Sequence, residues 1–492
     1  MKKIRERLNI LFAIALAFAA ASVLFLASCG KEEHVHEWSE WETFIPSTCF
    51  VVGQEKSTCA CGEERFRDIP LSHDFKESGI DIQKKSTVYT CSICGTETRE
   101  DLTYEDLGLP IVSFYGSMKG ITTSDRVTLD VKYESEDTEF EAKASLRIQG
   151  ATSTIYPKKN YSVKFLDSNE EKLKVSILDE WGSHSKYCLK ANYIDVTQAR
   201  NVVSAKLYGE IAKTRVKDDV ISTLTNCGAI DGFPVAVYLN DEFLGLYTFN
   251  TAKDEYIFNI KKLGGAKSAI LSSESFTDQT MLRSAITGTV EDAGFDLEYN
   301  STDKDTAWLI DSFNEMIEFI NNNDGFLFRQ GLSEYIDVDR AIDEMLFIYL
   351  IGGSDNISKN MLWVTYDGKV WIPSPYDLDS TWGLKWNAEG FFEPGIVKPG
   401  YPYNVLWGKL EQYFENEVSM RWAELRRGPV TAENIEKMFR DFVSLIPDNI
   451  YAAEREKWTE LPLIDSNNVE QIIEFAKANI AFLDEFYQYK EN

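Results

Sequence analysis

Positively charged residues are scarce in this chain of 492 residues. Lysine and arginine number 51 against 79 aspartates and glutamates, which gives a formal net charge of −28 at pH 7. Such a charge repels nucleic acid phosphates, and no basic patch of groove size offsets it, so nucleic acid is excluded as a partner. With 44% hydrophobic and 13% aromatic residues, the chain is also not of the disordered class. Its length allows about three domains.

Long apolar runs are limited to residues 10–27, which follow a basic leader and are interrupted by Ser22 alone. A basic leader and an apolar run are typical of a secretion signal. The next segment, Leu26-Ala27-Ser28-Cys29-Gly30, resembles the lipobox of bacterial lipoproteins. The resemblance implies a signal peptide over residues 1–28 and a lipid on Cys29. An uncleaved signal anchor is the alternative. We therefore expect a membrane-anchored protein, held by the lipid on the outer face of the bacterial cytoplasmic membrane.

Cysteine is sparse outside one short region. Apart from Cys29 there are seven cysteines, and an odd number cannot all pair within one chain. Five of them lie in a sequence that half-repeats itself between residues 36 and 95. In each half, a histidine followed by an acid and an aromatic residue leads to a threonine and two close cysteines: His36-Glu-Trp with Thr58-Cys59-Ala-Cys61-Gly62, and His73-Asp-Phe with Thr90-Cys91-Ser-Ile-Cys94-Gly95.

Thiolates and imidazoles at this spacing are zinc ligands, and a structural zinc site needs four of them. The first half offers four: His34 or His36, with Cys49, Cys59 and Cys61. The second half is one ligand short, with His73, Cys91 and Cys94, unless the two cysteine pairs combine into one four-cysteine site. Disulfides are the alternative. Residues 29–102 are therefore expected to form small zinc-ribbon-like units with a structural role. They resemble short repeats near the lipid anchors of some bacterial surface proteins, although Cys59-Ala-Cys61 has a shorter gap.

From about residue 103 the pattern changes to that of one α+β domain, residues 103–492. Alternating apolar residues predict strands, and apolar residues at helical spacing predict helices. The expected strands are 144–148, 161–165, 234–239, 243–249, 361–366 and 369–373, and the expected helices are 196–211, 307–320 and 339–351. The part after Asn404 is expected to be mostly helical.

A local excess of positive charge lies within residues 142–166, which contain no acid. The basic residues are Lys143, Arg147, Lys158, Lys159 and Lys164. An anionic ligand would need such a segment in so acidic a chain. The alternation of residues 161–165 predicts that Lys164 projects from the face opposite the apolar side chains. Between the two strands, the segment Gly150-Ala-Thr-Ser-Thr154 offers backbone amides to a phosphate. A solvated basic strand is the competing interpretation.

Carboxylate and amide side chains flank the second hairpin. Asp355-Asn-Ile-Ser-Lys-Asn360 precedes it, and Asp377-Leu-Asp379 follows it. Counting from the Asp367-Gly368 turn places Asn360 opposite Pro375, so these side chains should gather at the open end. Such oxygens suit Mg²⁺, which leaves positions for substrate phosphates, and a base beside it could orient a hydroxyl. The competing interpretation is that the acids only cap turns.

The ordered motifs together resemble the spore coat protein H (CotH-like) family of atypical kinases over residues of about 108 to 490. The matching segments are 146–150, 156–165, 191–195, Arg200-Asn201, 245–247, 355–360 and 377–383. The resemblance implies an atypical protein-kinase-like fold and transfer of the γ-phosphoryl group of Mg·ATP to Ser or Thr of secreted or surface proteins. It implies that Asp355 is the catalytic base, that Asn360 and Asp377 or Asp379 hold the metal, and that Lys159 or Lys164 binds phosphate.

Two departures from the family pattern bear on activity. Ala151-Thr152 follows Gly150 where the family usually has Asn with Ser or Thr, and Thr251 replaces an acid whose role Asp254 or Glu255 would have to assume. The alternative function is therefore an inactive kinase-like module that binds cell-wall or environmental polymers.

Overall fold

The computed structural model describes residues 35–215, 220–303, 305–400, 404–461 and 469–490. The predicted signal peptide, Cys29 and His34 lie outside these ranges. The described residues form two units: one extends up to Gly79 and includes Val88–Arg99, and the other combines Ile80–Thr87 with the chain from Glu100 onward. Within the described ranges, no helix has both the length and the apolar character needed to cross a membrane.

Two three-stranded sheets carry the cysteine and histidine repeats. The first sheet has the order β1-β2-β3 and the second β4-β5-β6. The strands are β1 (Glu42–Ile45), β2 (Gly53–Thr58), β3 (Glu64–Ile69), β4 (Phe75–Asp81), β5 (Ser86–Cys91) and β6 (Glu97–Asp101). Few of their side chains are buried, so little apolar area stabilises these sheets.

The larger unit begins with a closed barrel of seven strands in the order β10-β13-β15-β14-β7-β8-β9. Their bounds are β7 (Ile111–Tyr115), β8 (Val127–Glu134), β9 (Glu139–Gln149), β10 (Asn160–Leu166), β13 (Lys186–Lys190), β14 (Gly232–Leu239) and β15 (Glu242–Thr251). Alternate side chains fill the interior, as a barrel of this size requires. In β10 these are Tyr161, Val163 and Phe165, which belong to one buried cluster.

A second sheet, in the order β17-β16-β18-β19, lies beyond the barrel in the chain. Its strands are β16 (Ala269–Ser273), β17 (Phe295–Asn300), β18 (Met361–Thr365) and β19 (Ile372–Pro375). The two remaining strands pair only with each other and are β11 (Val175–Ser176) and β12 (Ser183–His184).

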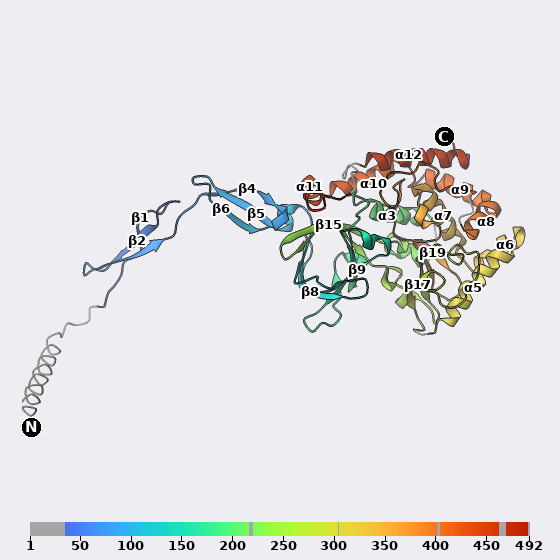
Figure 1. Cartoon of the computed structure of the whole chain (residues 1–492), viewed down its shortest axis with the longest axis horizontal. Helices are drawn as coiled ribbons and strands as arrows, with labels where there is room; N and C mark the ends of the chain where they lie inside the picture. The colour runs from blue at the N-terminus through green and yellow to red at the C-terminus, as the bar shows by residue number, and fades with distance from the viewer. Residues whose placement is uncertain (1–34, 216–219, 304, 401–403, 462–468, 491–492) are drawn as a thin grey trace, which may run out of the picture. The chain divides into compact units, whose positions relative to one another are not determined.

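Helices make up most of the rest of the larger unit and gather beyond the barrel strands (Figure 1). They are α2 (Tyr104–Leu107), α3 (Arg200–Lys213), α4 (Ile260–Leu263), α5 (Ala307–Asn322), α6 (Gly325–Gly331), α7 (Val338–Ile351), α8 (Val405–Tyr413), α9 (Glu415–Arg426), α10 (Ala432–Ser444), α11 (Asp448–Lys457) and α12 (Glu470–Phe486). Helix α7 is central, because nearly all its residues are buried, as in a helix surrounded by other elements. Asp337 caps its start, and Gly352, at a φ of 62°, ends it.

The predicted α+β class and the predicted strands and helices are confirmed, with two local corrections. Helix α3 begins at Arg200, not at residue 196, because the Asp195 carboxylate accepts hydrogen bonds from the backbone N–H groups of Thr197 and Arg200. The β18–β19 register is also displaced by one residue: Met361 faces Pro375, so Asn360 lies opposite Tyr376. The turn is longer than expected, since the Asp367 side chain accepts bonds from the amides of Lys369 and Val370.

A buried ion pair ties the barrel to a C-terminal helix. The Lys158 ammonium lies 2.6 Å from a Glu454 carboxylate oxygen, and the two side chains are 0% and 5% exposed. The other Glu454 oxygen accepts a hydrogen bond of 2.7 Å from the amide of Leu246 in β15. Lys158 also donates to the carbonyl of Ala191 at 2.9 Å. Both charges are therefore well satisfied, which is the condition under which a buried pair is tolerated.

Loss of one partner should be costly. We predict that Lys158→Met lowers the free energy of unfolding by about 3–5 kcal/mol, because the Glu454 carboxylate stays buried without a cation. The double variant Lys158→Met with Glu454→Leu should recover much of that loss. Urea denaturation followed by tryptophan fluorescence measures both. Lys437→Met, which removes an exposed pair with Asp441, is the control and should leave the midpoint unchanged. A Lys158→Met midpoint equal to that of the control would contradict the assignment.

Candidate active site

A cleft of about 750 Å³ opens on the outer face of the barrel. Barrel strands β9, β10 and β13 line one side of it. Residues of the second sheet and of the segments around Asp355 and Asp377 line much of the rest. Most of its charged groups come from elements far apart in the sequence, so the cleft exists only in the folded chain.

The barrel side of the cleft is basic. Lys164 in β10 faces Lys186 in β13, and Ser162 lies between Arg147 and Cys188 on the same surface. Lys190 follows two residues after Cys188 and shares this face. Lys164 projects away from the barrel interior, as the alternation predicts. Burial and the neighbouring cations Arg126, Lys186 and Arg147 lower the pKa of Lys164. This surface therefore has an excess of positive charge that an anion would relieve.

The basic residues of the segment 142–166 do not all reach the cleft. Lys159 donates to the carbonyl of Thr154 at 2.8 Å and to that of Tyr156, so its ammonium closes the loop after Gly150. Lys158 is buried against Glu454. Of the two lysines predicted as the phosphate-binding residue, Lys164 lines the cleft and Lys159 does not.

The loop after β9 brings backbone to the edge of the cleft. Residues 150–153 line it, and a short 3-10 helix, η2 (Thr152–Ile155), follows Gly150. Gly150 has a φ of +113°, and a Cβ there would lie 2.0 Å from the Ser153 hydroxyl oxygen. A side chain at this position would push the Ser153 hydroxyl aside and strain the backbone at this φ, which gives the glycine a physical role.

The opposite side of the cleft is acidic. Asp355 lies in a single turn, η8 (Ser354–Asn356), directly after α7. Asn360 and Asp377 flank the hairpin β18–β19, and both adopt positive φ angles of 54° and 51°. The Tyr376 amide donates to the Asn360 carbonyl at 3.0 Å, which holds the two ends of the hairpin together. The structure thus brings Asp355, Asn360, Asp377 and Asp379 to one wall of the cleft.

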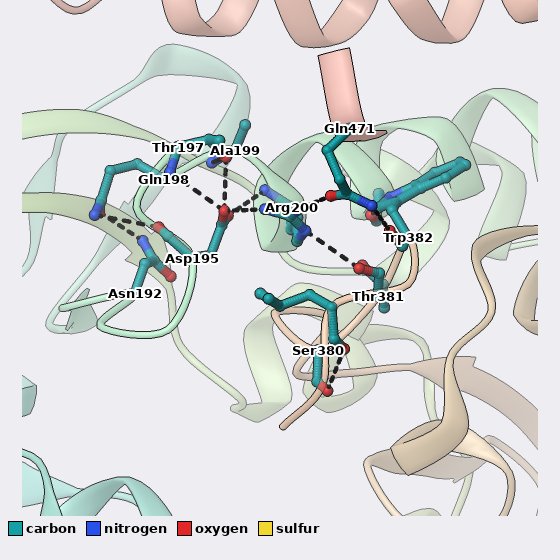
Figure 2. A network of polar contacts seen from close by, with 12 residues as sticks. Asn192, Asp195, Thr197, Gln198, Ala199, Arg200, Ser380, Thr381, Trp382 and Gln471 are labelled. Carbon is teal, nitrogen blue, oxygen red and sulfur yellow. Dashed lines mark hydrogen bonds and ion pairs between the residues drawn. The ribbon is translucent and has the colours of Figure 1, made fainter. Parts of the chain in front are cut away.

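A network of buried polar groups fixes the segment that carries Asp377 and Asp379 (Figure 2). Arg200, paired with Asp195, donates to the Thr381 carbonyl at 3.2 Å and to Gln471 at 2.6 Å. Gln471 in turn donates to the Trp382 carbonyl at 2.9 Å. The Asn201 side chain in helix α3 accepts from the amide of Leu378 at 3.0 Å. This bond holds Leu378, which lies between Asp377 and Asp379 in the chain.

The acids of this wall have different protonation tendencies. The Lys190 ammonium, 3.1 Å from Asp377, lowers the pKa of that carboxyl although burial opposes the effect. Burial and the neighbouring Asp377 carboxylate raise the pKa of Asp379 to about 8. Burial and Asp377 also raise the pKa of Asp355. Asp377 is therefore anionic near neutral pH, whereas Asp379 without a bound cation keeps its proton up to about pH 8.

This donor set fits Mg²⁺. Hard oxygen ligands are what the ion takes, and one or two carboxylates with substrate phosphates complete its shell. Asp377, Asn360 and Asp379 offer such oxygens on the cleft wall, and the raised pKa of Asp379 marks a carboxyl that a cation would stabilise in its charged form. Among the described residues, another trio of carboxylates is closer packed. The oxygens of Glu274, Asp296 and Glu298 lie within 4.8 Å of one another. Lys253 already pairs with Glu274 and Glu298, at 2.5 and 2.7 Å.

Sequence reasoning missed several residues of the cleft. Lys190 and Lys186 contribute to the basic wall, and Lys253 stands at the acidic side. The alternation in Lys186-Tyr-Cys-Leu-Lys190, directly before the motif at 191–195, was a usable signal for the first two. No pattern in the sequence indicated Lys253, because its partners Glu274 and Glu298 come from distant segments.

The two acids proposed to replace the family's acid after β15 have separate partners. Asp254 pairs with Lys186 and lines the cleft. Glu255 pairs with Lys261. Thr251 itself is buried, and its hydroxyl accepts from the Asp231 amide at 3.0 Å. Asp254 is therefore the acid that stands beside a cleft lysine.

The predicted cysteine and histidine ligands form two separate groups. Cys49 lies with His73, Cys91 and Cys94, whereas His36 lies with Cys59 and Cys61. The assignment of Cys49 to the first half of the repeat was therefore wrong, and so was the combined four-cysteine site. The position of Cys49 in the sequence, after β1, suggested ligands from the first half. The folded chain brings it to the ligands of the second half.

The family comparison agrees with this geometry. The family model described as CotH kinase protein matches residues 146–483, well over half of the chain. The chain belongs to the CotH kinase family. A search of curated proteins found no match.

The protonation of Asp379 makes stability depend on pH. An unfolded aspartate titrates near 3.9, so between about pH 4 and pH 8 the folded chain holds a proton that the unfolded chain releases. Stability should therefore fall as the pH rises through this window. We predict that Asp379→Asn removes this part of the slope and raises the melting temperature of metal-free protein by a few degrees at pH 8, with a smaller gain at pH 5.

Calorimetry in a chelator at pH 5, 6.5 and 8 measures this dependence. Asp292→Asn, at an exposed position, is the control and should follow the unchanged chain at each pH. Parallel pH profiles of the Asp379→Asn variant and the unchanged chain would contradict the assignment.

Proposed function

We propose that this member of the CotH kinase family is an active, ATP-dependent protein kinase of the bacterial cell surface, anchored by a lipid on Cys29. The observation that carries the proposal is the cleft itself: a basic wall of Arg147, Lys164 and Lys190 faces an acidic wall that includes Asp355 and Asp377. A nucleoside triphosphate with its cation has both charges and matches both walls.

The basic wall would bind the phosphates. Lys190 and Lys164 present ammonium groups on one face of the barrel, and the loop at 150–153 adds backbone next to them. The strands fix the backbone positions of these lysines, and the Lys190 ammonium is also held by Asp377 at 3.1 Å. The acidic wall would hold Mg²⁺ through Asp377 and Asn360, with Asp379 nearby, and Mg²⁺ neutralises charge on the transferred phosphoryl group.

Asp355 is suited to the role of base. It lies on the same wall as Asn360, which follows it five residues later in the chain, and the Lys359 ammonium lies 3.9 Å from its carboxylate. Its pKa is raised by burial, which makes it a better proton acceptor than an exposed aspartate. It would accept the proton of a Ser or Thr hydroxyl as that oxygen attacks the γ-phosphorus, while the bond from this phosphorus to the β–γ bridging oxygen breaks and ADP leaves. The acceptor class, a secreted or surface protein, follows from the predicted export of the chain.

The direct test is transfer of radiolabelled phosphate from ATP to the chain itself or to a serine-rich acceptor. We predict that Asp355→Asn lowers the rate at least 100-fold, since general-base catalysis contributes about 10²–10⁴-fold. The chain offers a matched control in Asp367→Asn, which changes an acid at the other end of the same hairpin, where an asparagine can still accept the two turn amides.

Full activity of Asp367→Asn with loss in Asp355→Asn supports the proposal. Equal labelling by Asp355→Asn and the unchanged chain would overturn the role of Asp355. Absence of labelling in the unchanged chain, together with retention on insoluble cell-wall glycan, would favour the inactive binding module.

A further inference from the structure

Cys49, His73, Cys91 and Cys94 form a compact group in the unit that extends up to Gly79 and includes Val88–Arg99, and none of them lines the cleft described above. The four ligand atoms all lie within 4.8 Å of one another. The Cys49 and Cys91 sulfurs are 3.5 Å apart, and the His73 Nδ1 atom is 3.2 Å from the Cys94 sulfur. Four ligands around a tetrahedral zinc, with Zn–S of about 2.3 Å, are separated by about 3.8 Å. The observed spacings are close to this value.

The local backbone has the shape of a metal-binding turn. The Gly95 amide donates to the Cys91 carbonyl at 2.9 Å, and Gly95 adopts a φ of 75°. Backbone N–H groups of Ile93 and Cys94 donate to the Cys91 sulfur. This geometry directs the sulfurs of Cys91 and Cys94 to the same side, as a two-cysteine knuckle requires.

Cys49 comes from the other half of the repeat, and the backbone holds it in place. The Ser72 amide, next to His73, donates to the carbonyl of Thr48 at 3.3 Å. Cys49 and Cys91 are 7% and 1% exposed, in sheets that bury few other side chains. Burial of two thiols there needs a stabilising bond, because apolar packing supplies little.

A disulfide explains less of this arrangement than a metal does. A Cys49–Cys91 bond would leave Cys94 and the His73 ring without a role, although both are within the same group. Zinc employs all four, with three thiolates and one imidazole, and leaves no open position for a reaction. The second group differs, since His36, Cys59 and Cys61 supply three ligands among the described residues.

We propose that Cys49, His73, Cys91 and Cys94 bind one structural Zn²⁺ that joins the first half of the repeat to the second. The metal would act as a cross-link between residue 49 and residues 73–94, and it would stabilise a segment that has little hydrophobic core. The site is independent of the kinase reaction.

Metal content of the full chain, purified without chelator, tests the proposal. Plasma mass spectrometry should find one zinc per chain fewer in Cys49→Ser than in the unchanged protein. Cys227→Ser removes a buried thiol of the larger unit and should leave the zinc content unchanged. Cys49→His keeps four ligands and should retain the metal, which separates loss of a ligand from general misfolding. In addition, a chelator should speed proteolysis between residues 49 and 94 in the unchanged chain.

Two results would overturn the proposal. One is an unchanged zinc content in Cys49→Ser. The other is a Cys49–Cys91 disulfide, identified by peptide mass spectrometry in protein that holds no zinc at this group. Because neither result involves phosphate transfer, the proposal can fail without affecting the proposed kinase.

Discussion

The buried ion pair between Asp195 and Arg200 holds the candidate active site in place. Asp195 accepts from the amide of Arg200, the first residue of helix α3, and from the Thr197 hydroxyl, and it also pairs with the Arg200 guanidinium. Arg200 then reaches Thr381 and Gln471, which connects the start of α3 to the acidic wall and to α12 (Figure 2). An unpaired charge at either position would be expensive in this interior.

This arrangement explains how two walls of opposite charge can stand close together in so acidic a chain. Lys190 lies on a barrel strand, and Asp377 lies on the segment held by α3. Their ion pair of 3.1 Å joins the basic wall to the acidic wall. Both positions are set by elements with their own hydrogen bonds, not by the ion pair itself. The site is therefore preorganised: a ligand with phosphate and cation would replace existing contacts without a need to assemble the walls.

The sequence allowed the secondary structure and the acidic wall to be predicted well. Alternation placed Lys164 on the outer face of β10, and turn residues located the β18–β19 hairpin, since both depend on local chemistry. Lys253 and the partners of Cys49 were missed because each depends on contacts between distant segments, whereas the alternation of residues 186–190 was a local signal for Lys190 that was not used. The register error had a local origin: the Asp367 side chain accepts bonds from amides two and three residues later and lengthens the turn, and propensity alone does not count such bonds.

The proposed function depends above all on a metal and nucleotide site at Asn360 and Asp377. Crystals grown with ATP and Mn²⁺, in place of Mg²⁺, allow the metal to be located by its anomalous scattering. A manganese peak is expected within coordination distance of Asn360 and Asp377, with the phosphates toward Lys164 and Lys190. A peak confined to Glu274, Asp296 and Glu298, or ATP bound without manganese near Asp377, would contradict it.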